Sequence, residues 1–446
     1  MPSKSRRSFV AVALLVPFLG LQGVHTDLLG DDWPQWLGER RDGIWRESGI
    51  IDRFPEGGPP VRWRTPIGAG YSGPAVVGDR VYITDWIKGE KNAGQERVLC
   101  LNEKNGKIVW KEEYDCDYNN MSYPAGPRTT PVVGDGKVWT LGAVSHLICF
   151  RAEDGKRLWE HELKRVYNAK MPIWGWAATP LLDGQKLIVL AGGEGSIAVA
   201  FDKDSGKELW RALTAAEPGY CPPMIYEAGG KRQLIVWHPE SINSLDPETG
   251  IVYWTRPWKI KAGLTIPTPR KQGNHLFFTA FYNGPRMFEL DGSRPDAKLL
   301  WKGNSNNEKR KTDKLHSIIS TPFLDGDHIY GICSYGQLRC LNVKTGERVW
   351  ESLKATDSDK RPFENNRWAN AFLIKHEDRY FIANEAGDLI IAKLTPNGYE
   401  ELGRAHLLEP TNAAGGRRVV WSHPAFANRC VYMRNDREII CVSLKK

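Results

Sequence analysis

The chain alternates short apolar runs with polar turns, and the spacing of its apolar positions is that of β-strands. The segment SGPAVVGDRVYITDW (residues 72–86) contains two apolar runs separated by a Gly-Asp pair, and RVLCLN (residues 97–102) alternates apolar and polar positions. Such alternation, interrupted by Gly-containing turns, is typical of antiparallel hairpins. Helical periodicity of useful length is absent, so the pattern predicts an all-β fold.

A longer pattern repeats along the chain, in which a Gly is followed four residues later by a Trp. Five copies are NGKIVW, DGKRLW, SGKELW, TGIVYW and TGERVW, and the related positions recur every 44 to 52 residues. Glycine at a turn permits a positive φ, and a large flat ring on an outer strand can bury apolar area between adjacent units. We therefore expect one docking ring per repeat, at Trp63, Trp110, Trp159, Trp210, Trp254, Trp301 and Trp350.

The number of repeats follows from their length. The 384 residues from Trp63 to Lys446 divide into eight units of 48, and eight first strands can be recognised: YSGPAVV, RTTPVV, AATPLL, CPPMIY, PTPRKQ, STPFLD, ANAFLI and SHPAFA. Four antiparallel strands in each unit of this length, repeated radially, predict an eight-bladed β-propeller. The last unit has only three strands, and PVRWRTPI supplies the fourth, so an N-terminal strand closes the ring and removes its free edges.

The first residues have the composition of an export signal. Basic residues precede an apolar run from Phe9 to Leu21, which is too short to span a bilayer comfortably but fits a signal peptide. SRRSFV at residues 5–10 resembles a twin-arginine motif, and an ordinary secretory signal is the alternative. We assign residues 1–26 to a signal peptide, residues 27–60 to an N-terminal arm with three Trp, and residues 61–446 to the propeller.

The remaining composition fits an exported, soluble protein of the periplasm or another extracytoplasmic space. Mean hydropathy is −0.45 and no later stretch could form a transmembrane helix. No Cys precedes Cys100, so a lipoprotein is not expected. The net charge is +8, but the one basic run, residues 309–311, has polar flanks and no nucleic-acid reader motif beside it. We expect no nucleic-acid partner.

The eight cysteines have no metal-binding spacing such as CxxC. Cys100, Cys149, Cys340 and Cys441 fall at one repeat position, which Ala or Ser occupies in other units, so packing explains them. Cys430 and Cys441 would face each other across the last hairpin if the chain turns between Asn435 and Asp436. An oxidising compartment would then permit a disulfide between them.

The segments that enter the innermost strands are rich in side chains suited to binding. Arg can hold a carboxylate bidentately, and Trp can stack on a flat or carbohydrate-like ligand. The alternative is that these aromatic rings simply fill the central channel. No paired carboxylates, nucleophile–base arrangement or phosphate loop stands out, so no catalytic residue is predicted. The candidate ligand-binding residues are Tyr71, Arg128, Trp174, Trp176, Tyr220, His316, Arg367, Trp368, Trp421 and His423.

The motif D-x-x-T-G-x-x-x-W, complete at Asp246 to Trp254 and varied elsewhere, resembles the tryptophan-docking repeat of pyrroloquinoline-quinone-like (PQQ-like) propellers. The resemblance covers residues 61–446. It implies one of two functions. Quinoprotein dehydrogenases of this fold bind PQQ and Ca²⁺ and oxidise alcohols or sugars, whereas BamB-like proteins bind no cofactor and serve as scaffolds for outer-membrane assembly.

Departures from both groups decide which function we expect. No adjacent cysteine pair is present, the blades are compact, and no Glu/Asn/Asp trio for Ca²⁺ can be picked out, which counts against a dehydrogenase. The missing lipidation Cys counts against a typical BamB. We expect a non-catalytic binding or scaffold protein of the cell envelope, monomeric, with an envelope protein or small molecule at the central channel. The alternative is a quinoprotein-type oxidoreductase that uses PQQ and Ca²⁺.

Overall fold

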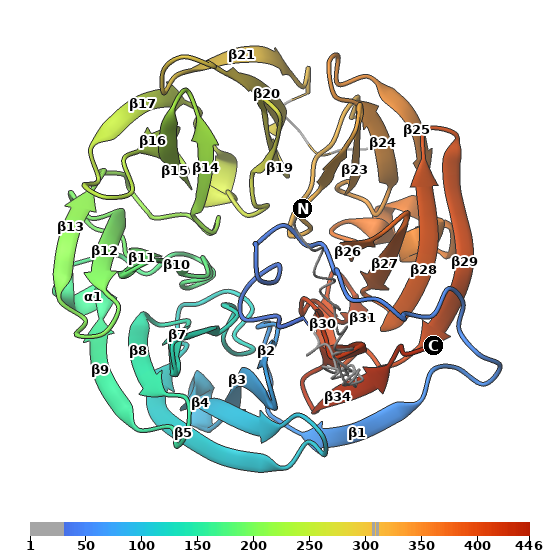
Figure 1. The fold of residues 1–446 in the computed structure, drawn as a ribbon, viewed down its shortest axis with the longest axis horizontal. Coiled ribbons are helices and arrows are strands. Elements are labelled where there is room, and N and C mark those ends of the chain that lie inside the picture. The colour runs from blue at the N-terminus through green and yellow to red at the C-terminus, as the bar shows by residue number, and fades with distance from the viewer. Residues whose placement is uncertain (1–30, 306–307, 309–311) are drawn as a thin grey trace, which may run out of the picture.

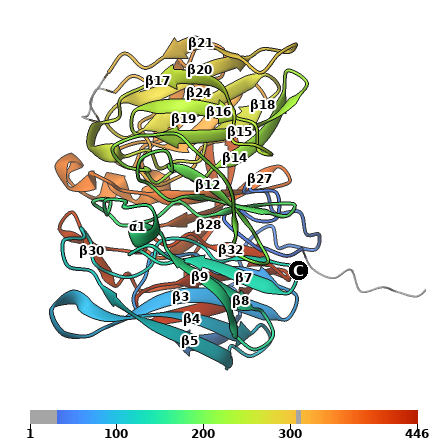
Figure 2. The ribbon, with the colours of Figure 1, turned by 90° about the vertical axis from the view of Figure 1, so that its left-hand side faces the viewer.

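A computed structural model describes residues 31–305, 308 and 312–446 of the chain. The expected signal peptide, residues 1–26, lies outside the described residues. The described chain forms eight four-stranded antiparallel sheets arranged around a central axis (Figure 1; the side view is Figure 2). The predicted eight-bladed β-propeller is confirmed, and each blade begins at the first strand that the sequence pattern marked.

Each blade runs outward from the axis in chain order. Blades 1 to 4 consist of β2 (Ala75–Val77), β3 (Arg80–Lys88), β4 (Ala93–Asn102) and β5 (Ile108–Asp117); β6 (Val132–Gly134), β7 (Lys137–Leu141), β8 (His146–Arg151) and β9 (Arg157–Glu162); β10 (Leu181–Asp183), β11 (Lys186–Leu190), β12 (Ala198–Asp202) and β13 (Glu208–Ala212); and β14 (Met224–Ala228), β15 (Lys231–His238), β16 (Ser241–Leu245) and β17 (Val252–Pro257).

The next three blades repeat this order, and the eighth is composite. They consist of β18 (Arg270–Gln272), β19 (His275–Ala280), β20 (Gly284–Leu290) and β21 (Ala297–Lys302); β22 (Phe323–Asp325), β23 (His328–Ile332), β24 (Leu338–Asn342) and β25 (Arg348–Ser352); β26 (Ala371–His376), β27 (Arg379–Asn384), β28 (Asp388–Thr395) and β29 (Gly398–His406); and β32 (Ala425–Ala427), β33 (Cys430–Arg434), β34 (Glu438–Ser443) and β1 (Val61–Pro66).

The elements outside the blades are short. A two-stranded hairpin pairs β30 (Asn412–Ala414) with β31 (Arg417–Val419). The helical segments of the described chain are α1 (Leu163–Val166) and five 3₁₀ turns: η1 (Glu90–Asn92), η2 (Lys261–Gly263), η3 (Lys354–Thr356), η4 (Ser358–Lys360) and η5 (Phe363–Asn366).

The N-terminal strand closes the ring, as the strand count predicted. Strand β1 pairs antiparallel with β34, and Trp63 lies opposite Cys441 in that pair. The two ends of the propeller are therefore held in one sheet. Backbone hydrogen bonds between β1 and β34 take the place of a free edge on the last blade.

The seven repeat tryptophans lie on the outermost strands. The Nε1–H of six of them donates to a backbone carbonyl of the following blade, for example from Trp110 to Ala152 at 2.9 Å and from Trp301 to Val343 at 2.8 Å. Trp254 instead donates to the Gln233 side chain of its own blade, at 2.9 Å. In five cases the Trp ring packs against the turn glycine of the next blade. The facing pairs are Gly106 with Trp63, Gly155 with Trp110, Gly206 with Trp159, Gly250 with Trp210 and Gly346 with Trp301.

The N-terminal arm crosses one end of the ring and is tied to several blades. Trp33 exchanges two backbone hydrogen bonds with Val76, at 2.8 and 2.9 Å. The rings of Trp33 and Trp45 are buried and pack on Phe426, with centroids 6.0 and 5.0 Å apart. The arm therefore crosses one end of the ring (Figure 1) and contributes Trp33, Trp45 and Ile50 to its hydrophobic core.

The last hairpin differs from the predicted register by two residues. Cys430 lies opposite Ser443, and Cys441 lies opposite Tyr432. The turn is centred one residue later than expected, because the Asn435 side-chain oxygen accepts hydrogen bonds from the backbone N–H of Arg437 and Glu438. The two cysteines are thus diagonal neighbours rather than a facing pair, and both thiols are free.

Candidate functional site: a central aromatic pocket

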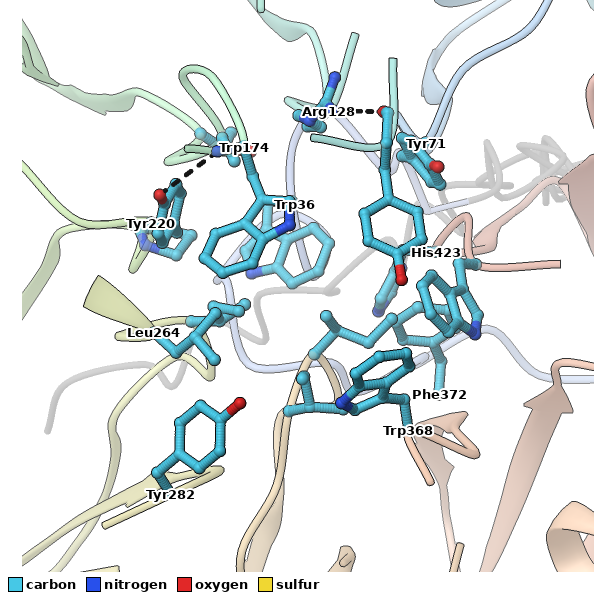
Figure 3. Close-up of a pocket in the computed structure, with 18 residues that line it drawn as sticks. Trp36, Tyr71, Arg128, Trp174, Tyr220, Leu264, Tyr282, Trp368, Phe372 and His423 are labelled. Atoms are coloured by element: carbon cyan, nitrogen blue, oxygen red, sulfur yellow. Dashed lines mark hydrogen bonds between the residues drawn. The ribbon is translucent and has the colours of Figure 1, made fainter. Parts of the chain in front are cut away.

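A cavity of about 220 Å³ lies on the axis of the propeller (Figure 3). Its walls come mainly from the segments that lead into the innermost strands, because the topology brings every first strand to the axis. All eight blades and the N-terminal arm contribute. The lining residues are Trp36, Tyr71, Tyr123, Arg128, Trp174, Ala177, Thr179, Tyr220, Pro222, Leu264, Ile266, Tyr282, Ile318, Ile319, Trp368, Phe372, Trp421 and His423.

Seven of the ten candidate binding residues line this pocket: Tyr71, Arg128, Trp174, Tyr220, Trp368, Trp421 and His423. The other three are not part of the lining, although Arg367 is a partly exposed neighbour of Trp368. Trp176 is buried and donates through Nε1 to the Ala191 carbonyl at 2.9 Å. His316 is buried and donates through Nδ1 to the Phe281 carbonyl at 2.9 Å. Arg367 is paired with Glu308 at 2.8 Å.

Other aromatic residues of the lining were not among the predicted site residues. Trp36 belongs to the arm, and Tyr282 lies between β19 and β20, outside the segments that precede first strands. Tyr123 and Phe372 lie close to segments that the sequence did mark. The repeat pattern gives no position for the arm, so only the unusual density of Trp in residues 33–45 could have indicated Trp36.

Trp36 forms the floor of the pocket. Its Nε1–H donates to the Thr268 hydroxyl at 2.9 Å, and its ring lies 4.6 Å from that of His423, centroid to centroid. Arg41 lies on the same arm and donates to the carbonyls of Pro180 and Pro223, at 2.8 and 3.4 Å. Burial lowers the pKa of Arg41 to about 10. The arm therefore closes one end of the channel.

Arg128 carries the charge of the pocket. Among the described residues that line it, none is Asp, Glu or Asn. The guanidinium of Arg128 donates to the carbonyls of Ser122 and Tyr123, at 3.1 and 2.7 Å, and lies 5.2 Å from the centre of the Tyr71 ring. Burial lowers the pKa of Arg128 and raises the pKa of Tyr71. Below the strongly alkaline range, the site therefore presents one positive charge among aromatic rings.

Two aromatic residues of the wall have a strained backbone. Trp368 has φ +67° and Tyr123 has φ +53°, in the left-handed region that bulky residues rarely adopt. The Trp368 N–H donates to the Ser334 carbonyl at 2.9 Å, and the Tyr123 carbonyl accepts from Arg128. Strain of this kind persists only where the surrounding structure holds it, and it concentrates at functional sites.

A buried carboxylate orients Trp421 from behind the wall. Glu385 is 1% exposed and accepts from Trp421 Nε1 at 3.1 Å. It also accepts two hydrogen bonds from Arg417, at 2.7 and 2.9 Å. Because this pair is bidentate and buried, it fixes the angle of the Trp421 ring.

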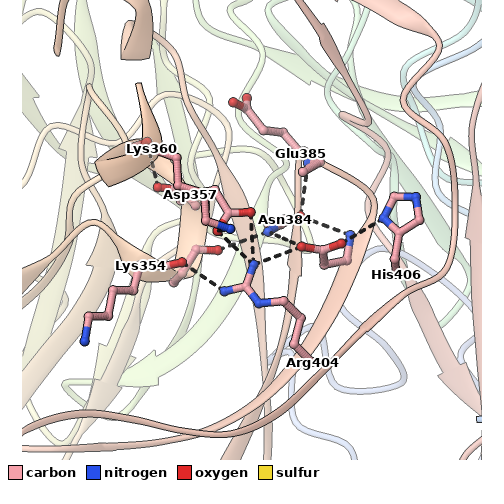
Figure 4. Close-up of polar contacts among 12 residues, drawn as sticks. Lys354, Asp357, Lys360, Asn384, Glu385, Arg404 and His406 are labelled. Atoms are coloured by element: carbon pink, nitrogen blue, oxygen red, sulfur yellow. Dashed lines mark hydrogen bonds and ion pairs between the residues drawn. The ribbon is translucent and has the colours of Figure 1, made fainter. Parts of the chain in front are cut away.

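A polar cluster on blade 7 anchors the loop that carries Trp368 (Figure 4). Arg404 of β29 pairs with Asp357 at 3.1 Å and with Asp388 at 2.9 Å, and donates to the Lys354 carbonyl at 3.0 Å. Burial alone would raise the pKa of Asp388, but hydrogen bonds from His406 and Arg404 outweigh it and lower that pKa. The cluster holds η3 and the residues after it against the blade.

The described residues contain no helix long and apolar enough to cross a membrane. A family profile described as outer membrane protein assembly factor BamB matches residues 94–222 and 238–446, which is more than half of the chain. BamB of Burkholderia pseudomallei (strain K96243) is 22% identical over 311 residues, which cover 67% of this chain and 70% of that protein.

Two solved structures share the fold. BamB from Moraxella catarrhalis superposes with a TM-score of 0.54 at 16% identity, covering 85% of this chain and 97% of its own. The quinohemoprotein alcohol dehydrogenase of Comamonas testosteroni superposes with a TM-score of 0.63 at 12% identity, covering 93% and 81%. At these identities the superpositions show the fold alone, and the sequence profile decides the family. The chain belongs to the PQQ-like β-propeller family described as outer membrane protein assembly factor BamB.

Proposed function

We propose that this chain is a non-catalytic binding or scaffold protein of the cell envelope, and that its central pocket holds the ligand. The observation that carries the proposal is the make-up of the pocket: rings from most of the blades surround one arginine, and none of the described lining residues is a carboxylate. A concave, mostly apolar site with a few convergent polar groups is the usual form of a ligand-binding site. An acid–base pair for catalysis is not part of the described lining.

The chemistry of the pocket indicates the class of ligand. Arg128 donates to three backbone carbonyls, those of Gly126, Ser122 and Tyr123. Because a guanidinium has five N–H groups, donors remain for a ligand. A cation beside aromatic faces favours an anionic ligand with a flat apolar surface, such as an aromatic carboxylate, an acidic sugar or a peptide carboxylate.

The quinoprotein alternative requires a calcium site, and the donors of this pocket do not fit one. Calcium takes about six to eight oxygen ligands, with carboxylates prominent among them. The side-chain oxygens of the described lining are hydroxyls, from Tyr71, Tyr123, Thr179, Tyr220 and Tyr282. Glu385, behind Trp421, is already bound by Arg417. The pocket thus supports stacking and anion binding better than a calcium-bound quinone.

The location and the partner are further parts of the proposal. Membership of the BamB family and the signal peptide predicted at residues 1–26 favour export to the periplasm or another extracytoplasmic space. The protein partner would be one of the envelope. The docking role of the seven repeat tryptophans is likewise proposed, on the basis of their contacts with the following blade.

Ligand titration of the mature chain tests the proposed pocket. A panel of aromatic carboxylates, acidic oligosaccharides and peptides is followed by tryptophan emission and by melting temperature. Replacing Arg128 with Gln should weaken binding of the best anionic ligand about tenfold or more, since a hydrogen bond to a charged group contributes about 1.5–3 kcal/mol. Arg256→Gln on the outer wall is the matched control and should not change affinity. Equal affinity in Arg128→Gln and the native chain would contradict the proposal.

A further inference from the structure

A cluster of two thiols and a carboxylate lies outside the central pocket, at the seam where β1 closes the ring between the last blade and the first. Cys430 begins β33, Cys441 lies in β34, and Glu103 follows β4 in the first blade. One ligand atom from each residue lies within 4.8 Å of the other two, and all three residues are buried. The cluster therefore joins the last blade to the first.

The other blades show which residue type normally occupies the position of Cys430. Cys430 is the first residue after the turn between the first two strands of its blade, where it pairs with Ala427. The equivalent residue of every other blade is basic. These residues are Arg80, Lys137, Lys186, Lys231, His275, His328 and Arg379.

In two of these blades the basic residue forms an ion pair with a turn carboxylate of the following blade. Lys137 pairs with Asp204 at 2.9 Å, and Lys186 pairs with Glu248 at 2.7 Å. A cation at this position thus links adjacent blades. In the last blade a thiol replaces the basic side chain, and the carboxylate of the following blade that approaches it is Glu103, one residue earlier in the turn than Asp204 and Glu248 are in theirs.

Arg62 of β1 supplies the positive charge at the seam. Its Nη1 donates to the Cys430 sulfur at 3.3 Å and pairs with Glu103 at 2.5 Å. The Tyr432 hydroxyl also donates to Glu103, at 2.6 Å. The Arg62 side chain is 31% exposed, so its guanidinium can move toward solvent, whereas the thiols are fixed by β33 and β34.

The diagonal register favours a shared ion over a disulfide. Diagonal neighbours in an antiparallel pair have Cα atoms about 7–8 Å apart, and a disulfide usually requires about 4.4–6.8 Å. Two thiolates bound to one tetrahedral ion at about 2.3 Å lie roughly 3.8 Å apart. The separation of the ligand atoms, within 4.8 Å, is compatible with the second arrangement.

We propose that Cys430, Cys441 and Glu103 bind a thiophilic divalent cation such as Zn²⁺. Both thiols release their protons to solvent, Arg62 withdraws from the cluster, and a water completes four-coordination. The bound ion links the last blade to the first, as lysine does at other interfaces. The sequence does not reveal this site, because its ligands come from two strands and a turn with no local metal-binding spacing.

Titration with Co²⁺, followed by displacement with Zn²⁺, tests the site in the reduced mature chain. We expect about one equivalent of Co²⁺ to produce a thiolate-to-cobalt absorption band, and Zn²⁺ to abolish it and raise the melting temperature. Cys441→Ala should remove the band. Cys340→Ala is the matched control, because Cys340 lies opposite Trp350 as Cys441 lies opposite Trp63; it should retain the band.

A second variant keeps the test independent of core packing. Arg62→Ala removes the competing cation from a partly exposed position, so it should bind Co²⁺ several-fold more tightly than the native chain. The proposal is overturned if the reduced chain shows no thiolate band, if Cys441→Ala keeps it, or if Arg62→Ala binds no more tightly. A mass loss of two hydrogens that maps to a Cys430–Cys441 cross-link in the untreated protein would also overturn it.

Discussion

Contact between a docking Trp and the turn glycine of the next blade can be tested by adding one methyl group. A Cβ at Gly155 would lie 2.7 Å from Cε3 of Trp110, a ring that is 8% exposed. Gly136 in the same blade has a similar positive φ, +69° against +78°, but a Cβ there meets nothing within 4 Å. The pair Gly155→Ala and Gly136→Ala therefore separates the backbone effect from the contact with the ring.

The expected magnitudes follow from these geometries. Alanine in a left-handed conformation costs about 1–2 kcal/mol, which applies to both variants. Forcing a carbon into a well-packed site costs about 1–3 kcal/mol more, which applies only at Gly155. With unfolding entropy of about 2.1 cal/mol/K per residue, 1 kcal/mol corresponds to about 1 °C in a chain of this size.

Differential scanning calorimetry at one scan rate is the assay. Gly155→Ala should melt about 2–5 °C below the native chain and Gly136→Ala about 1–2 °C below it. If the two substitutions lower the melting temperature by the same amount, the contact between the Trp110 ring and Gly155 does not contribute to stability. The account of how blades dock would then be refuted.

Three further predictions concern closure, pH and the pocket wall. Deleting residues 58–68 removes β1, so the melting temperature should collapse; an unchanged melt would contradict closure by that strand. Burial lowers the pKa of His423 to about 4. Since the unfolded chain binds this proton near pH 6.5, its contribution to stability is complete above that pH and is lost as pH falls toward 4. Between pH 7 and 4.5, the melting temperature of His423→Phe should therefore fall by less than that of the native chain. An equal fall would be inconsistent with a buried neutral imidazole. Glu385→Gln keeps the shape but weakens the pairing with Arg417, so it should shift or broaden the emission of Trp421 and lower ligand affinity about tenfold; unchanged emission and affinity would remove Glu385 from the positioning role.

The blade architecture could be predicted because its determinants are local and repeat. Each Gly-x-x-x-Trp copy encodes a turn and an outer strand within six residues, so the period alone gives eight blades and a missing strand at the end. The segment PVRWRTPI was the one strand left to complete the last blade, and β1 is the fourth strand of that blade. Long-range pairing between the two ends of the chain was thus predictable from a local count.

The pocket was predictable only where topology decides position. Segments before first strands must reach the axis, which explains why Tyr71, Arg128, Trp174 and Trp421 line the cavity. Trp176, two residues beyond Trp174, is buried in the wall, because loop side chains do not follow a fixed alternation.

The path of the arm and the register of the last hairpin depend on tertiary contacts and single side chains. Trp36 reaches the floor through its hydrogen bond to Thr268, 232 residues away. Asn435 moves the turn by one residue through two side-chain hydrogen bonds. Neither interaction leaves a periodic signal in the sequence.

We propose that this propeller binds its ligand without catalysing a redox reaction. The most direct measurement is a dye-linked dehydrogenase assay on the mature chain after incubation with PQQ and Ca²⁺, across primary alcohols and sugars. We expect no reduction of the dye above the rate of free PQQ and no Ca²⁺-dependent change in the quinone spectrum. Ca²⁺-dependent turnover that is lost when Trp174 is replaced by Ala would contradict it and establish a quinoprotein.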